Sequence, residues 1–320
     1  MNLQELYGPA PTSDKSDFIR KARFLQSWYR VNVLNEKTYG NGPNENSPTK
    51  NGNMLVDGIN SGANFLSPEI FNYAHFRVVH KKKGETIEPF RLFSNMLGSQ
   101  PMCFNLFYPL KALFEQVNPS SATKILDACL PELKIATILS IEIEYFPYPK
   151  SEYLNDLTAF DAMILYKSQA GERNILAIET KYTETLGSNS SGDLTAQIQL
   201  VNESPYFNKK GKEHGRIGFG QLGRNFLLAE KYRIENRLDK CFAVVIAPDG
   251  NSSTDTEIEQ FQSWMNPDYQ NRLFTLSLNK MIHSIQINGP SATKNWAASF
   301  KQRYLDFEQC EEEYKKYRKS

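Results

Sequence analysis

Two charged residues interrupt a short apolar segment, and an aspartate lies in the apolar segment before it. Glu179 and Lys181 belong to the run 175–181, ILAIETK, and Asp161 belongs to the run 160–166, FDAMILY. Residues two apart in a strand point to the same face, so Glu179 and Lys181 share one face of the predicted strand. Charges in an apolar strand cost free energy unless they are paired, hydrated or bound to a metal. An aspartate followed by Glu-x-Lys on the next strand is the arrangement that metal-dependent hydrolysis of a phosphodiester needs.

Such a hydrolysis requires a nucleophilic water, stabilisation of charge on the phosphate and help for the leaving oxygen, and one or two Mg²⁺ ions can supply all three. Mg²⁺ prefers oxygen ligands and keeps several waters. Asp161 and Glu179 are the candidate carboxylate ligands, and the carbonyl of Thr180 is a candidate third oxygen. Lys181 would orient or help to deprotonate the water. The alternative is that the same charges form a cross-strand ion pair on a solvated sheet face.

The Glu-x-Lys tripeptide is a weak signal outside this context. It occurs three times, beginning at Glu132, Glu179 and Glu313. Only the middle copy lies in a strand-like apolar run that follows a strand with an aspartate. The other two copies are typical of solvated helix faces, so the neighbouring elements carry the inference.

The overall composition is that of a globular protein without a charge bias. Of the 320 residues, 40% are hydrophobic and 12% are aromatic, which is enough for a sizeable core. The formal net charge is +1, so a nucleic-acid site would have to be a local basic patch. The four cysteines form no Cys-x-x-Cys pair, and no apolar run is long enough to span a bilayer. We expect a soluble cytoplasmic protein with no membrane partner.

The predicted elements place the charged residues on a sheet covered by helices. Helical spacing or composition predicts helices in 14–37, 89–117, 122–130, 221–233, 255–266 and 292–318. Strands are predicted in 135–145, in the two runs with the charged residues, and in 243–248 and 274–276. The polar segment 183–217 is expected to be a partly ordered insertion. The order helix, three-strand meander, helix, strand predicts an α/β fold (α+β mixed sheet).

We divide the chain into three parts on this basis. Residues 1–63 would form an N-terminal helix and long loop extension, 64–288 the core, and 289–320 a C-terminal helix that packs on the core. Helical additions at both ends would therefore flank one central sheet domain.

Four segments together resemble a known enzyme superfamily. Residues 158–162 (TAFDA) and 178–184 (IETKYTE), with 95–107 and 221–225 (QLGRN), resemble the PD-(D/E)XK nuclease superfamily, in particular an uncharacterised bacterial branch. Phe160 stands where that superfamily usually has proline. The resemblance implies a restriction endonuclease-like core and a nuclease that uses Mg²⁺, with Mn²⁺ as an alternative. It also implies DNA as the partner and a homodimer as one option.

The helix predicted to begin at Gln221 carries candidate accessory residues. Gln221, Arg224 and Asn225 share one face by their spacing. They resemble the accessory positions that follow the lysine strand in the superfamily, which makes Gln221 a candidate catalytic residue. Arg224 and Asn225 would then be nucleic-acid contacts. An ordinary amphipathic helix with a polar outer face is the alternative interpretation.

A basic stretch precedes this helix. Its cationic residues that suit contacts with the phosphate backbone are Lys209, Lys210, Lys212 and Arg216. Tyr206 and Phe207 come just before it and would be available to stack on a splayed base. A solvated flexible loop is the more common origin of such a run, and we favour that interpretation.

Three further residues are candidate accessory positions. Glu144 lies on the strand before Asp161 and Glu184 lies just after Lys181, and either is a candidate for the metal shell, although solvation of an edge strand explains both more simply. Asn105 lies in the helix that often contributes an acid in the superfamily, and no acid occupies 95–109 here. The same fold without catalysis, as a nucleic-acid-binding or adaptor protein, is the alternative function.

Overall fold

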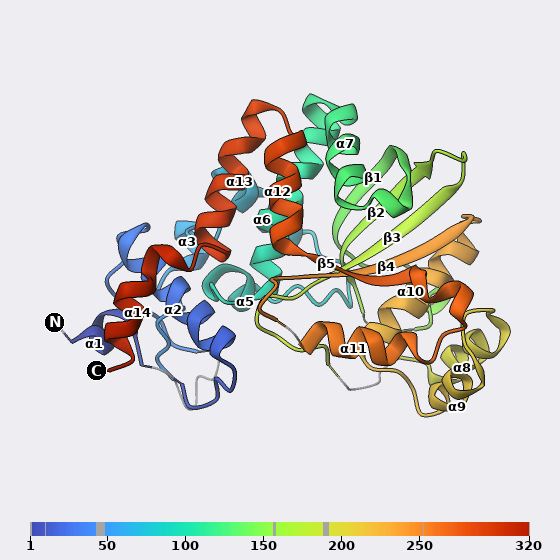
Figure 1. The fold of residues 1–320 in the computed structure, drawn as a ribbon, viewed down its shortest axis with the longest axis horizontal. Helices are drawn as coiled ribbons and strands as arrows, with labels where there is room; N and C mark the ends of the chain where they lie inside the picture. Colours follow the sequence, from blue (N-terminus) through green and yellow to red (C-terminus); the bar gives the residue numbers. More distant parts are fainter. Residues whose placement is uncertain are drawn as a thin grey trace.

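One mixed sheet of five strands forms the centre of the molecule, as the computed structural model shows (Figure 1). The structure describes residues 2–9, 11–42, 49–155, 158–187, 192–251 and 253–319. The strands are β1 (Ile135–Tyr145), β2 (Phe160–Ser168), β3 (Arg173–Thr180), β4 (Lys240–Ala247) and β5 (Leu273–Ser277). Mixed pairing in one sheet confirms the predicted fold class.

The strands lie in the order β1-β2-β3-β4-β5. The first three form an antiparallel meander, and β4 and β5 pair parallel to their neighbours. Parallel pairing needs a crossover connection, and helices supply it on the way from β3 to β4 and from β4 to β5. Gly171 has a φ of +87° in the turn between β2 and β3, a conformation that favours glycine.

Helices cover both faces of the sheet. On one face the apolar core includes side chains of α2 (Asp17–Asn32), α4 (Pro68–Val79), α5 (Pro89–Ser94), α6 (Ser99–Ala112), α7 (Pro119–Cys129), α12 (Leu278–Asn288) and α13 (Ser291–Tyr304). On the other face the core includes side chains of α8 (Leu194–Glu203), α10 (Gln221–Glu235) and α11 (Ser253–Gln262), with α9 (Lys209–Gly215) beside α8. The shorter helices are α1 (Leu3–Tyr7), α3 (Gly58–Ser61) and α14 (Glu311–Tyr317).

Alternation along β3 decides which face each charged residue occupies. Leu176 and Ile178 belong to the core on the α6 face, whereas Ile175 and Ala177 belong to the core on the α10 face. Continuing this period of two directs the side chains of Glu179 and Lys181 toward α10. The strand therefore delivers its acid and its lysine to the start of that helix.

The two ends of the chain pack together. Tyr7 of α1, Phe24 of α2 and Tyr314 of α14 form one buried cluster. Ala22 of α2 and Phe300 of α13 also reach the main core, so both terminal parts are attached to the sheet domain. The three-part division of the chain stays a prediction. Among the described residues, no helix is long and apolar enough to cross a membrane.

Two segments differ from the sequence prediction. The polar stretch 183–217 contains α8 and α9, because Gln197, Leu200 and Val201 of α8 are buried at helical spacing. The C-terminal region is two helices, since α13 ends at Tyr304 and α14 begins at Glu311. In α8, Leu200 and Val201 pack in the core on the α10 face, and the local composition conceals these contacts.

Candidate active site

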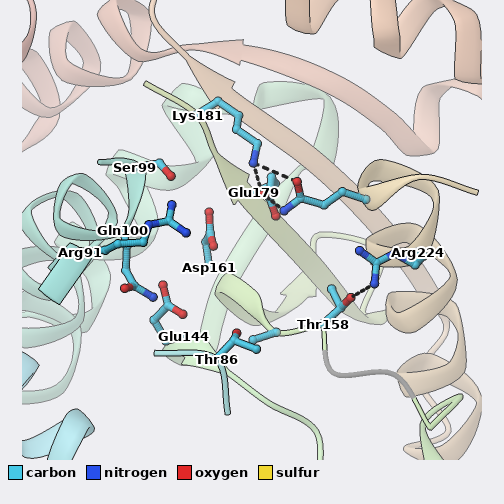
Figure 2. A pocket seen from close by; sticks show the side chains of 12 residues that line it. Thr86, Arg91, Ser99, Gln100, Glu144, Thr158, Asp161, Glu179, Lys181 and Arg224 are labelled. Atoms are coloured by element: carbon cyan, nitrogen blue, oxygen red, sulfur yellow. Dashed lines mark hydrogen bonds and ion pairs between the residues drawn. The ribbon is translucent and has the colours of Figure 1, made fainter. Parts of the chain in front are cut away.

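Three acidic residues lie in a row across the first three strands. Ala162 pairs with Ile143 of β1 and with Ile178 of β3. Continuing these registers by one residue sets Asp161 between Glu144 and Glu179. All three acids line a cavity of about 340 Å³, together with Thr86, Arg91, Ser99, Gln100, Thr158, Ala159, Lys181, Gln221 and Arg224 (Figure 2).

Asp161 is fixed by the next strand. Its Oδ2 accepts hydrogen bonds from the backbone N–H of Thr180 at 2.7 Å and from the Thr180 hydroxyl at 2.8 Å. Burial, followed by the negative charge of Glu179, raises the pKa of Asp161 to about 7, although Lys181 and the Thr180 hydrogen bonds act in the opposite direction. A carboxylate that is oriented and poorly stabilised as an anion is suited to bind a cation.

Glu179 is the most heavily contacted of the three acids. Its Oε1 lies 2.7 Å from Nζ of Lys181 and 2.6 Å from Nε2 of Gln221, and its Oε2 accepts a hydrogen bond of 2.5 Å from Nδ2 of Asn225. The Gln221 side chain also accepts a bond of 3.0 Å from Lys181, so one amide joins the acid and the lysine. The side chain of Glu179 is only 5% exposed, and these contacts offset the cost of burying its charge.

Lys181 stays protonated in this environment. Burial alone would lower its pKa, but the nearby carboxylates of Glu179 and Asp161 outweigh that effect, and the pKa is raised above its usual value. The residue is therefore a fixed positive charge at the wall of the cavity.

Glu144 reaches the cavity through an irregular backbone. It has a φ of +52°, and Ile143 and Glu144 are both buried where strict alternation would expose one of them. Arg77 holds this distortion by donating to the backbone carbonyls of both residues. Solvation at an edge strand, the simpler explanation in the sequence, does not apply because Glu144 is 3% exposed.

One oxygen of the Glu144 carboxyl group lacks a partner in the described part of the chain. Oε1 of Glu144 is buried and has no hydrogen-bond partner among the residues that the structure describes. Burial and the neighbouring Asp161 raise its pKa well above the usual range. A buried oxygen without a donor costs free energy, and a cation or an added proton would remove that cost.

The cavity as a whole fits a divalent cation that keeps part of its water shell. It offers clustered carboxylates, and burial together with neighbouring negative charge raises the pKa of Asp161 and of Glu144. Carboxylate oxygens are the ligands that Mg²⁺ prefers. In the part of the chain that the structure describes, no three acidic, histidine or cysteine side chains form a closed ligand set. One or two carboxylates with several waters would therefore hold the ion.

A comparison with protein-family models identifies the superfamily of the chain. The model described as the PD-(D/E)XK nuclease superfamily matches residues 12–306. The chain belongs to the PD-(D/E)XK nuclease superfamily. This confirms the resemblance, and the match extends well beyond the four segments between 95 and 225 that carried it. Searches of curated proteins and of solved structures gave no match.

Superfamily members are generally nucleases, so the matched family supports a hydrolase acting on phosphodiester bonds. The proline of the usual motif is Phe160 here, which is fully buried in the core on the α10 face. Phe160 therefore belongs to the apolar core, and Asp161 keeps its place beside Thr180.

Three residues that the superfamily resemblance suggested are not at the cavity surface. Asn225 is buried behind Glu179, so its amide supports that carboxylate and cannot reach a nucleic acid. Asn105 is fully buried and joins α6 to Asn64 and Tyr304. Glu184 accepts from the N–H of Ser99 at 2.8 Å and so caps α6. We assign structural roles to these three residues.

Thr180 does not line the cavity either. Its side chain is fully buried, and its amide and hydroxyl position Asp161.

Arg91 and Arg224 stand on opposite sides of the cavity in Figure 2. Arg224 donates from Nη1 to the Thr158 hydroxyl at 2.8 Å. Arg91 is exposed on α5, 4.0 Å from Glu184. Sequence reasoning missed Arg91, because only the packing of α5 beside the end of β3 brings it to the site.

The basic stretch forms helix α9 and lies outside this cavity. Lys209, Lys210 and Arg216 are exposed, and Lys212 donates to the carbonyl of Asn202 at 3.0 Å. The stretch is thus an ordered surface and not the loop that we favoured. Its neighbours Tyr206 and Phe207 are buried in the core on the α10 face and cannot stack on a base.

Proposed function

We propose that this superfamily member is a metal-dependent deoxyribonuclease. The supporting observation is the meeting of Asp161, Glu179 and Lys181 in one cavity, with Glu144 as a further acid. An acidic cluster that binds a divalent cation, next to a fixed ammonium group, is suited to hydrolyse a phosphodiester.

Asp161 and Glu179 would hold Mg²⁺ or Mn²⁺, with Glu144 as an accessory acid nearby. Thr180 does not line the cavity, so the ligand role that the sequence suggested for its carbonyl stays a prediction. When bound, the ion would lower the pKa of a water and offset charge on the phosphate. Thr180 keeps the Asp161 carboxylate oriented through its two donors.

Lys181 and Gln221 act together in this proposal. Because its pKa is raised, Lys181 would orient the water and offset phosphate charge as an ammonium group, which favours this role over that of a base. Gln221 contacts both Glu179 and Lys181, so it would fix the distance between the acidic and basic groups.

DNA would approach along the cationic groups around the cavity. Arg91 and Arg224 line it, and we assign them contacts with the phosphates that flank the cut. The exposed side chains of Lys209, Lys210 and Arg216 would contact the backbone further away. Lys212 is less suited to contact DNA, since its ammonium group already donates to the carbonyl of Asn202.

Cleavage of supercoiled plasmid tests the proposal. The wild-type protein with Mg²⁺ or Mn²⁺ should nick or linearise the plasmid, and EDTA should stop the reaction. Lys181→Ala and Asp161→Asn should each lower the rate at least about 100-fold, as for loss of a group that acts in the transition state. Lys315→Ala is the matched control, because Lys315 lies in another Glu-x-Lys tripeptide on an exposed helix. Full activity of Lys181→Ala would refute the assigned role.

A protein that binds nucleic acid on the same fold without cleaving it is the second candidate. It draws on one observation, namely that protein groups already occupy both oxygens of Glu179. Calorimetric titration with Mg²⁺ and Mn²⁺ separates the two functions. Binding of DNA without any affinity for either ion would favour the second candidate.

A further inference from the structure

A second cavity lies beside the candidate active site and shares a wall with it. Its volume is about 440 Å³, within the range of about 300–1,000 Å³ that is usual for ligand pockets. Gln221 lines both cavities. The backbone N–H of Gln221 donates to the carbonyl of Gly187 at 2.7 Å, and the N–H of Gly187 donates back to the Gln221 side chain at 3.2 Å. This pair of residues forms the divide between the two spaces.

The lining of the second cavity is mainly apolar and aromatic. Its buried side chains include Leu222 and Phe261. The rings of His214 and Trp264 stack with centroids 3.8 Å apart and an angle of 21° between their planes. Ile217, at the rim, is 71% exposed although it is apolar. A stacked aromatic pair beside an exposed aliphatic side chain is a surface on which a flat ring can lie.

The charges around this groove suit a phosphate-bearing ligand. Arg216, which precedes Ile217, is exposed, and so is Lys210 on the same helix as His214. Among the described residues of the lining, the one acid is Glu257, whose Oε2 accepts from the N–H of Leu186 at 3.2 Å. The segment 209–216, which includes His214 of the lining, carries four cationic side chains and one acid, Glu213, so the apolar interior lies beside a segment of net positive charge.

We propose that this groove binds an unpaired base of the DNA strand whose phosphate lies in the candidate active site. The inference rests on the proposed nuclease function and specifies its substrate class. A base in a duplex is stacked on both faces and paired at its edge, so it must leave the helix to enter a separate cavity. The preferred substrate is then DNA that is single-stranded at the cut.

Equilibrium binding without catalysis tests this inference. The full-length protein in EDTA is titrated into a short single-stranded oligonucleotide that carries 2-aminopurine, and into the same sequence as a duplex. Ile217→Ser and His214→Ala should each weaken binding of the single strand about 10-fold, the usual worth of stacking one base. Duplex binding should change less than about 2-fold in both variants, because backbone contacts dominate it.

The controls separate a local effect from a folding defect. Ile217 is exposed, so its replacement leaves the core intact, and Ile287→Ser on α12 is matched to it because Ile287 is 65% exposed. The 2-aminopurine fluorescence should be quenched by the wild-type protein and by Ile287→Ser, and the quenching should be lost in His214→Ala.

Each outcome decides one of the two proposals. Equal losses on single strand and duplex, unchanged binding in the groove variants, or no binding of the single strand would overturn the base site. Plasmid cleavage that depends on Lys181 would then leave the nuclease function standing. Base quenching that depends on His214, in a protein that never cleaves with Mg²⁺ or Mn²⁺, would support the groove and refute the nuclease.

Discussion

The titration of Asp161 makes the stability of the metal-free protein depend on pH. The pKa of this carboxyl rises from 3.8 to about 7 on folding, chiefly through burial and then through Glu179. Between about pH 4 and pH 7 the folded protein keeps a proton that the unfolded chain has released. The free energy of unfolding therefore falls as the pH rises through this window. Each pKa unit is worth about 1.4 kcal/mol, so the full effect is about 4 kcal/mol.

The Asp161→Asn variant isolates this contribution because it keeps the size of the side chain and removes its titration. From about pH 5 upward about two pKa units of this window remain, about 2.7 kcal/mol, and water around the partly exposed Asp161 reduces the effect, so we expect about 1–2.5 kcal/mol between about pH 5 and about pH 8. Urea unfolding in EDTA is followed by circular dichroism at about pH 5 and about pH 8. The wild-type protein should lose that much stability relative to Asp161→Asn as the pH rises, while the exposed Asp268→Asn gives no such trend.

Metal binding should reverse the loss. At about pH 8, Mg²⁺ at 100 times its dissociation constant should stabilise the wild-type protein by about 2.7 kcal/mol and Asp161→Asn much less. A difference between the two proteins that stays constant with pH, or one that favours the wild type more at high pH, would refute the reasoning about this carboxyl.

Three further substitutions, two beside the site and one in the N-terminal part, test the packing of the structure, each by urea unfolding. Asn225→Ala removes a hydrogen bond to the buried Glu179 and should cost about 1.5–3 kcal/mol; a loss below about 0.5 kcal/mol would show that the contact is not formed. Gly223→Ala would bring a Cβ to 2.3 Å from Cβ of Phe219, so overpacking of about 1–3 kcal/mol should exceed the helix gain of about 1 kcal/mol. Arg30→Lys should cost at least about 2 kcal/mol, because a lysine cannot reproduce the planar donors that bind four backbone carbonyls, and equal stability would contradict that role.

Local pattern was enough to predict the central strands. The alternation within 135–145 predicted β1, and the apolar runs around Asp161 and Glu179 predicted β2 and β3, with nearly the observed bounds. Gly171 marked the turn between the last two. Helix α10 was also expected from Gln221 onward. These features depend on neighbours within a few residues, which the sequence displays directly.

The surroundings of each side chain were harder to predict from the sequence. The spacing along α10 predicted that Asn225 points outward, but the structure buries it against Glu179, since the face of α10 that packs on the sheet includes polar residues. Glu144 was expected to be solvated. Its own backbone has a left-handed conformation, which Arg77 holds, and its side chain therefore lines the cavity. Neither the burial of Asn225 nor the orientation of Glu144 follows from a periodic pattern in the sequence.

The sequence by itself therefore determined the superfamily, the mixed sheet and the strand pair with Asp161, Glu179 and Lys181. Strand and helix periods are local properties, and a family match needs only the order of residues. Tertiary structure alone decided that Arg91 joins the cavity and that Gln221 separates it from the groove beside His214. Those placements depend on packing between elements far apart in the chain, where burial and like charges, and not spacing, set the character of each group.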